Sequence, residues 1–197
     1  ELNTNELYGR NLTAGALDVM GQYYSVASSS HAFYNYGGLV YTGNDEKALF
    51  DNMWQKCYAV IACCNTIIEK CDENKAGLSP VWRGSIKGEA LALRAMLHFD
   101  MLRLFGPLTS ELDKESIPYQ TNSDQTVTPL LSGSEVVGLI LDDLKNAVGL
   151  LKDTDPYFVE EEFSDTDLNY RRFRMNYFAA KGLMARVQLW GGDKEKA

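Results

Sequence analysis

Residues 51–71 carry a pattern of apolar side chains that is typical of an amphipathic helix. When each residue advances by about 100°, as a helix of about 3.6 residues per turn requires, the apolar side chains gather on one side. This side consists of Met53, Trp54, Cys57, Tyr58, Val60, Ile61, Cys64, Ile67, Ile68 and Cys71. One polar residue, Asn65, falls inside the apolar arc, where an amide without partners costs about 1–3 kcal/mol. The pattern predicts a long helix with a wide buried face.

A second stretch, residues 85–105, is apolar on nearly every side. One face consists of Ile86, Ala90, Leu93, Leu97, Met101 and Leu104, and another of Leu91, Ala95, Phe99 and Leu102. Such a helix is a central one that several neighbours cover. Its ionisable residues are Glu89, Arg94, His98, Asp100 and Arg103. Charged groups on a buried helix need partners or an outlet to water.

The polar residues of these two helices are interpreted as structural. We predict that Glu89 and Arg94 form an ion pair with each other or act as two packing anchors. His98 is interpreted as a core histidine that bonds a backbone carbonyl. Asn65 and Trp54 are predicted to tie their helix to a neighbouring loop, with ligand contact as the alternative.

All four cysteines lie on the first predicted helix. Cys57, Cys64 and Cys71 are seven residues apart, so successive thiols stand about 10 Å apart along the axis. A disulfide needs Cα atoms within about 7 Å, and a metal needs ligands that converge. We therefore expect these three to be small buried hydrophobes, with Cys63 on another side and no metal bound.

Residues 23–45 break the helical periodicity and are rich in Ser, Gly, Asn and aromatic side chains. A long loop of this kind is usually functional or disordered, and disordered segments are poor in aromatics. Aromatic faces with hydroxyl and amide groups suit a sugar ring, so the loop is the candidate ligand site. Its candidate residues are His31, Phe33, Tyr34, Asn35, Tyr36 and Tyr41. The alternative is that these aromatics fill the space between helix ends.

The remaining segments complete a helical chain. We expect a helix from Asn3 or Thr4 to about Gly21, and a turn at 75–79 before Pro80. Residues 109–131 are predicted to be an extended connection, and residues 152–169 a solvated acidic loop. Ser132 and Glu135 form a capping box before another helix. The last helix contains the small residues Ala179, Ala180, Gly182 and Ala185, then a turn at 191–193, and residues 194–197 are expected to begin a further helix.

Four segments carry a resemblance to a known family. They read Trp54-x3-Tyr58-x2-Ile61-x3-Asn65-x2-Ile68, then Gly88-Glu89-Ala90-x3-Arg94-Ala95-x3-Phe99-x2-Leu102-Arg103-x-Phe105-Gly106-Pro107, then Asp142-Asp143-Leu144-x2-Ala147-x2-Leu150-Leu151, and Ala179-Ala180-x2-Leu183-x-Ala185-Arg186-Val187-x-Leu189-Trp190-x2-Asp193-x3-Ala197. In this order they resemble the N-terminal half of the SusD/RagB family, over residues 45–197. The last helix and the turn after it also resemble the start of a tetratricopeptide repeat.

The resemblance implies an all-α fold of tetratricopeptide-like helical hairpins with long irregular loops. Residues 1–197 are then a single helical domain, with the C-terminal part of the family missing. The family's members bind glycans or other nutrients at the cell surface and cap a TonB-dependent outer-membrane transporter. A SusC-like transporter is thus the implied partner, and the outer membrane the implied location. The family's lipidated cysteine would lie before Glu1, so the anchor is outside this sequence.

Composition excludes several other classes. The formal net charge of −8 argues against nucleic-acid binding, and no apolar run approaches the ~18 residues that span a membrane. The chain has no catalytic motif such as Gly-x-Ser-x-Gly or His-Glu-x-x-His, so no catalytic residue and no cofactor are predicted. The rival hypotheses are a helical-repeat scaffold that binds a peptide or protein partner, and an enzyme that degrades polysaccharide.

Overall fold

A computed structural model describes residues 2–124, 126–155, 171, 173–195 and 197. It divides into two compact units, Glu1–Val60 and Ile61–Ala197, whose boundary falls within one long helix. No described helix is both long enough and apolar enough to cross a membrane.

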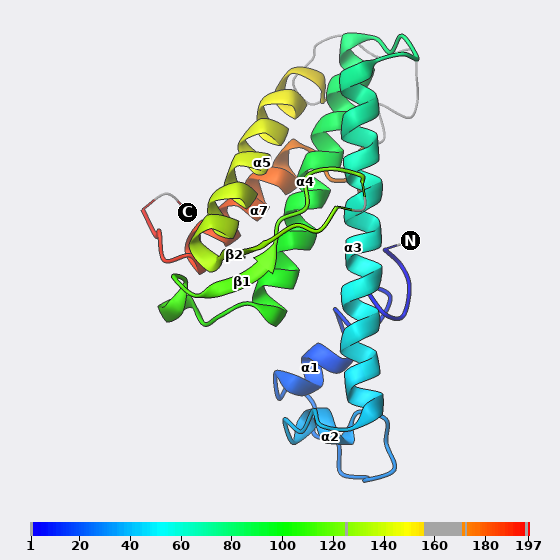
Figure 1. The fold of residues 1–197 in the computed structure, drawn as a ribbon, viewed down its shortest axis with the longest axis vertical. Coiled ribbons are helices and arrows are strands. Elements are labelled where there is room, and N and C mark those ends of the chain that lie inside the picture. Colours follow the sequence, from blue (N-terminus) through cyan, green and yellow to red (C-terminus); the bar gives the residue numbers. More distant parts are fainter. Residues whose placement is uncertain (1, 125, 156–170, 172, 196) are drawn as a thin grey trace. The chain divides into compact units, whose positions relative to one another are not determined.

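The first unit contains α1 (Ala16–Met20), α2 (Tyr34–Gly37) and the beginning of α3 (Asn44–Glu73) (Figure 1). The predicted helix from Asn3 or Thr4 to Gly21 is wrong, because residues 2–15 form successive turns. Two glycines explain the turns: a β-carbon on Gly9 would lie 2.6 Å from the Thr4 carbonyl oxygen, and one on Gly15 would lie 2.8 Å from that of Arg10. The chain folds back too tightly at these points for a regular helix.

The predicted face of the first long helix is largely confirmed. Helix α3 starts at Asn44, earlier than expected, and buries the apolar residues Met53, Cys57, Ile61, Cys64, Ile68 and Cys71. The four cysteines are free, with Cys63 exposed as predicted. Burial raises the pKa of the Cys64 thiol to about 11, which suits an inert core side chain. Ile67 is the exception, since it is 41% exposed in spite of its place in the pattern.

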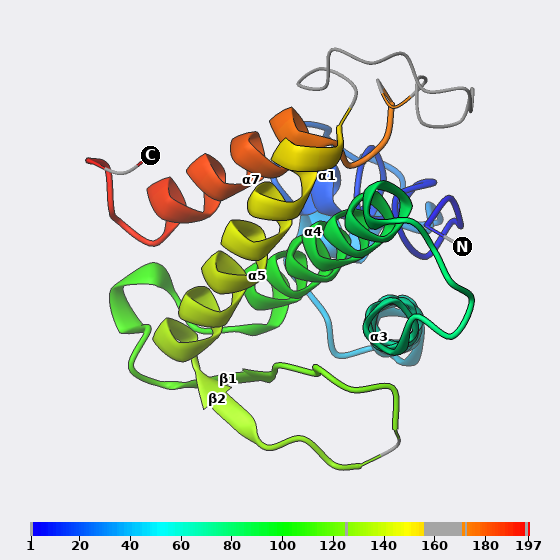
Figure 2. The same ribbon diagram turned by 90° about the horizontal axis from the view of Figure 1, so that it is seen from above.

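The second unit contains the rest of α3 with α4 (Pro80–Phe105), α5 (Gly133–Thr154) and α7 (Tyr177–Trp190). Helix α5 packs against both α4 and α7, as the view from above shows (Figure 2). Helix α4 is buried on several sides, as its composition predicts. The all-α class is confirmed.

Glycines allow α4 and α5 to approach each other closely. A β-carbon on Gly84 would lie 2.6 Å from Cγ2 of Thr154, and one on Gly88 would lie 2.8 Å from Cγ of Leu151. Contacts this short do not occur, so only glycine fits at these two positions unless the helices move apart.

The helix ends follow from local chemistry. Ser79 caps α4 by accepting a hydrogen bond from the Trp82 amide, and Pro80 occupies the first turn, where its missing N–H costs nothing. The capping box of Ser132 and Glu135 is present at the start of α5. Asn176 caps α7 through the amide of Ala179.

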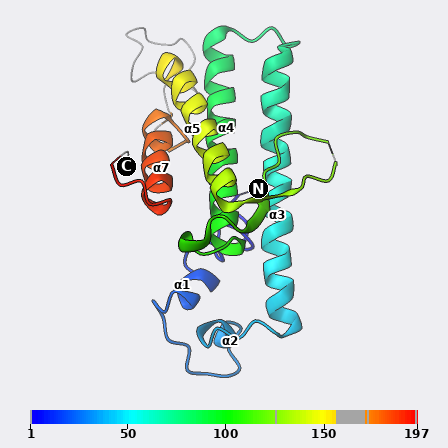
Figure 3. The same cartoon turned by 60° about the vertical axis from the view of Figure 1, so that its left-hand side comes forward.

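The connections differ in part from the prediction. Residues 109–131 contain a 3-10 turn (η1, Thr109–Glu111) and strand β1 (Glu115–Pro118), which pairs antiparallel with β2 (Leu130–Ser132). Both strands are labelled in Figures 1 and 2, and Figure 3 shows the same fold from another side. The expected helix at 194–197 is not formed by its described residues, because Lys194 and Glu195 lie in a turn and Ala197 has no regular structure. Of the predicted acidic loop, Lys152–Thr154 belong to α5, and residues 156–170 lie outside the described part of the chain.

A buried ion pair joins α4 to α5. The guanidinium of Arg94 donates to both carboxylate oxygens of Asp143, at 2.7 Å each. Its Nη1 also donates to Oδ1 of Asn65 on α3, at 2.8 Å, and Asp143 accepts a third hydrogen bond from the Tyr119 hydroxyl. Two-pronged charged hydrogen bonds fix orientation as well as distance, so this cluster holds three helices in register.

The same cluster fastens the segment after β1. Asn65 donates to the carbonyl oxygens of Gln120 and Asn122, which confirms the predicted tie to a loop for Asn65. The ring of Trp54 lies against that of Tyr58 on its own helix, at a centroid distance of 4.7 Å. His98 bonds the Arg94 carbonyl through Nδ1, as predicted, and its Nε2 accepts from the Gln120 amide. Since Nε2 accepts, the imidazole is neutral with its proton on Nδ1. Burial lowers the pKa of His98 to about 3.

Glu89 and Arg94 do not pair with each other, so the ion-pair form of that prediction is wrong and the anchor form is confirmed. Glu89 accepts from Arg171 at 3.3 Å and from Arg174 at 2.9 Å. Arg171 in turn binds Asp155, whose other oxygen accepts from the Tyr177 amide at the start of α7. Each of the two charges on α4 therefore anchors a different neighbour, because they lie on different sides of the helix.

We expect Asp143→Ala to lower the free energy of unfolding by about 3–5 kcal/mol, because it leaves the Arg94 guanidinium buried without its partner. Lys145→Ala is the matched control, since it breaks the exposed pair with Asp142 on the same helix and should cost less than about 1 kcal/mol. Urea unfolding followed by circular dichroism measures both. Equal losses for the two variants would contradict the anchoring role.

We expect His98 to make stability depend on pH. Because its pKa is lower in the folded chain than in the unfolded one, its stabilising contribution is complete above pH ~6.5 and is lost as the pH falls toward 3. Between pH 7 and pH 5 the loss should be about 2 kcal/mol. His98→Asn cannot titrate, so its unfolding free energy should change less over this range. If the unfolding free energies of the two proteins change equally between pH 7 and pH 5, His98 is not the source of the pH dependence.

Candidate ligand-binding site

The candidate loop is held by the small core of the first unit. This core is formed by Ala16, Val19, Tyr36 and Met53, and partly buried side chains such as Phe33, Tyr41 and Phe50 pack against it. Tyr36 is only 2% exposed, and its ring meets those of Phe33 and Phe50 edge-on at centroid distances of 5.8 and 6.0 Å. Edge-on packing is a preferred aromatic arrangement, so these rings fix the loop in place.

The six candidate residues thus fall into two groups. Tyr36, Phe33 and Tyr41 turn toward the core, as the space-filling alternative expected. His31, Tyr34 and Asn35 are exposed, with Tyr34 42% exposed. Helix α2 brings Tyr34 and Asn35 together, and His31 comes just before it. The structure therefore leaves three of the six side chains open to solvent.

One hollow beside α2 is named here the tyrosine hollow, and its volume is about 390 Å³. It is lined by Gln22, Tyr24, Ser25, Val26, Tyr34, Asn35, Gly37, Gly38 and Val40. The Gln22 side chain donates to the Gly37 carbonyl at 3.0 Å, and the backbone of Gln22 lies in the left-handed region at φ 62°. This bond closes the loop around the hollow.

Tyr24 was not among the candidates predicted from the sequence, yet it lines the tyrosine hollow and is 55% exposed. The signal that could have found it is its place in the same aromatic loop. Periodicity could not separate it from Tyr36, because an irregular loop gives no rule for which ring is buried.

A second hollow, named here the acidic hollow, shares Tyr34 and Asn35 with the tyrosine hollow and has a volume of about 600 Å³. It is lined by Arg10, Ser29, Ser30, His31, Ala32, Phe33, Tyr34, Asn35, Tyr36, Asp45, Glu46 and Leu49. The Asn35 amide donates to Oε1 of Glu46 at 2.8 Å, and the Phe33 amide donates to Nδ1 of His31 at 3.1 Å. Tyr34 and Asn35 therefore line both hollows.

The two hollows offer flat rings beside hydroxyl, amide and carboxylate groups. Rings supply apolar faces and polar groups fix orientation, which is the composition of a small-molecule site. No group of His, Cys, Asp and Glu side chains in the described ranges could hold a metal ion. The arrangement suits reversible binding of a polyhydroxylated ring.

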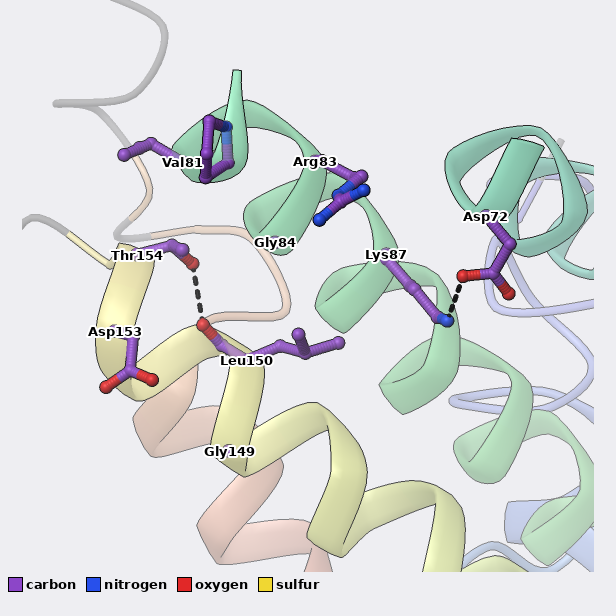
Figure 4. A pocket seen from close by; sticks show the side chains of 10 residues that line it. Asp72, Val81, Arg83, Gly84, Lys87, Gly149, Leu150, Asp153 and Thr154 are labelled. Carbon is purple, nitrogen blue, oxygen red and sulfur yellow. Dashed lines mark hydrogen bonds and ion pairs between the residues drawn. The ribbon is translucent and has the colours of Figure 1, made fainter. Parts of the chain in front are cut away.

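Another hollow, of about 460 Å³, lies in the second unit between the end of α3, the start of α4 and the end of α5 (Figure 4). Its charged residues are Asp72, Arg83, Lys87 and Asp153. Lys87 pairs with Asp72, and Thr154 bonds its own helix through the Leu150 carbonyl. It shares Lys87, Gly149 and Leu150 with a neighbouring groove along α4 and α5. This hollow has no aromatic side chain in its lining.

Comparison with known proteins identifies the relatives of the chain. A SusD-like protein of Bacteroides ovatus is 30% identical over 146 residues, which cover 72% of this chain and 23% of that protein. A SusD-like protein of Formosa agariphila is 34% identical over 96 residues, 48% of this chain and 17% of that protein. The matched segments thus span less than a quarter of each of these relatives.

Solved structures share the fold. A SusD-like carbohydrate binding protein of Bacteroides vulgatus superposes with a TM-score of 0.73 at 22% identity, over 100% of this chain and 39% of that one. A structure described as containing a xylogluco-oligosaccharide superposes with a TM-score of 0.60 at 21% identity, over 88% of this chain and 30% of that one. The model of a SusD-like family, described as "Starch-binding associating with outer membrane", matches residues 13–189. On this match over most of its length, the chain belongs to the SusD-like family.

Proposed function

We propose that the chain is the helical scaffold and one ligand-contact loop of a cell-surface glycan-binding protein. The observation that carries this proposal is the family match over residues 13–189, which includes the loop and every residue that lines the two hollows except Arg10. The family's description names binding and no reaction, which favours a binding protein over an enzyme. The xylogluco-oligosaccharide of the structural neighbour supports an oligosaccharide as the ligand class.

In this proposal the exposed rings of Tyr24 and Tyr34 stack on the apolar faces of sugar rings. Asn35 and His31, beside them, offer polar atoms to sugar hydroxyl groups. Tyr36, Phe33 and Tyr41 act indirectly, because their packing holds α2 and the loop in one conformation. A pre-ordered loop loses less conformational entropy on binding.

The wider role is also a proposal. The protein would be lipid-anchored at the outer membrane and would deliver its oligosaccharide to a SusC-like TonB-dependent transporter. The family's association with the outer membrane supports the location. Co-purification of the native protein with an outer-membrane barrel protein tests the partnership, and a protein that remains alone after mild detergent extraction would count against it.

A peptide-binding scaffold is the second candidate, and the groove along α4 and α5 favours it. This groove has a volume of about 630 Å³, and Ile68, Leu91 and Leu150 line it together with the polar side chains of Lys87 and Asn146. A mixed apolar and polar groove between helices fits an extended peptide. Lys87 is already paired with Asp72, however, so its ammonium group is less available to hydrogen-bond a ligand than the polar groups of the loop.

We expect Tyr34→Ala and Tyr24→Ala each to weaken glycan binding by the native protein about tenfold, because a stacked ring at a binding hot spot contributes more than ~1 kcal/mol. Tyr23→Ala is the matched control: Tyr23 is an exposed tyrosine of the same loop, and it lines neither hollow. Isothermal titration calorimetry with oligosaccharides first identified on a glycan array gives the affinities.

Thermal unfolding separates binding from folding. Tyr34→Ala should leave the melting temperature nearly unchanged, whereas Tyr36→Ala should lower it, since it removes a buried ring at a cost of about 3–5 kcal/mol. Unchanged affinity in Tyr34→Ala and Tyr24→Ala would move the ligand site elsewhere in the protein.

A further inference from the structure

The charged groups of the acidic hollow are two carboxylates and one guanidinium. Asp45 and Glu46 supply the carboxylates and Arg10 the guanidinium. The formal charge of the lining is therefore −1. A ligand that enters this hollow meets those charges at short range, where a single unit charge alters binding more than it does in bulk water.

The carboxylates are held in place. Both belong to the first turn of α3, where free backbone N–H groups favour negative charge. Glu46 is only 6% exposed, and its Oε1 accepts the 2.8 Å hydrogen bond from Asn35. Gly43 leaves room for this carboxylate, because a β-carbon there would collide with Oε2 of Glu46. The hydrogen bond from Asn35, which lines both hollows, thus holds this negative charge in the lining of the acidic hollow.

Arg10 offsets only one of the two negative charges in the lining. Among the described residues it forms no salt bridge, its Nε donates to Oδ1 of Asn11 at 3.1 Å, and its guanidinium lies over the Phe33 ring at 5.6 Å. A guanidinium over an aromatic face is attracted to the ring itself. Within the described part of the chain Asp45 and Glu46 thus form no ion pair, and the lining keeps its net formal charge of −1.

A buried tyrosine in the lining, Tyr36, responds to the same two carboxylates. Burial raises the pKa of Tyr36 to about 12, and the charges of Glu46 and Asp45 contribute to this rise. Both carboxylates thus oppose a negative charge on the Tyr36 side chain. An anionic sugar placed in the hollow would experience the same repulsion.

We propose that the acidic hollow selects uncharged glycans and rejects sugars that carry a carboxylate or sulfate. This specificity rests on the proposed function of the loop and adds the substrate class to it. Asp45 is the accessible determinant and Glu46 the buried one. Neutral sugar hydroxyl groups donate hydrogen bonds to these carboxylates, whereas a uronate must bring its own negative charge against them.

The test compares matched ligands on the native protein. A neutral gluco-oligosaccharide that the protein binds is titrated beside its counterpart oxidised to carboxylate at C6, at low and high salt. We expect the neutral ligand to bind at least about tenfold more tightly than the acidic one at low salt. This ratio of affinities should decrease in ~0.5 M NaCl, where charges are screened beyond a few ångströms. Asp45→Asn should bind the uronate more tightly, so the neutral-to-acidic affinity ratio at low salt should decrease about threefold.

Asp51→Asn is the matched control, because it removes an exposed carboxylate of the same helix that does not line the hollow. An equal effect of Asp51→Asn and Asp45→Asn, or equal affinity for the neutral and acidic ligands, would overturn the proposed selectivity while leaving glycan binding intact. Binding that does not depend on Tyr34, or no binding to any glycan, would instead overturn the proposed function and this inference with it.

Discussion

The buried pair of Arg94 and Asp143 is the interaction on which the second unit depends. It joins α4 to α5 directly, reaches α3 through Asn65, and fastens the segment after β1 through Tyr119. Such a pair is costly to desolvate and is favourable only when every donor and acceptor is satisfied. Here the surrounding amide, hydroxyl and carbonyl groups meet that condition, so the pair specifies one arrangement of the helices.

The sequence predicted this part of the fold well because helical periodicity is a local property. The buried face of α3, the central position of α4 and the capping box of α5 all follow from residues within one element. The charged partners of Glu89 and Arg94 did not follow, because they come from segments 49 to 85 residues away. Periodicity marks a charge as buried, but only the packed fold decides which opposite charge reaches it.

The candidate site shows the complementary limit. Composition identified residues 23–45 as an ordered aromatic loop, and the structure places these aromatics both in a core and around two hollows. The sequence could not decide which ring does which, since Tyr34 and Tyr36 are alike except for the direction in which a short helix turns them. The successive turns at residues 2–15 were not predicted either. They depend on close backbone contacts at Gly9 and Gly15, which helical periodicity does not reveal.

Gly84 and Gly88 have a consequence beyond their own positions. They set the separation of α4 and α5, and the reach of Arg94 to Asp143 is measured across that separation. A methyl group added at either glycine would push the axes of α4 and α5 apart. The two hydrogen bonds from Arg94 to Asp143, about two helical turns away, would then lengthen. Two residues without side chains thus control the geometry of a buried ion pair in which they take no part.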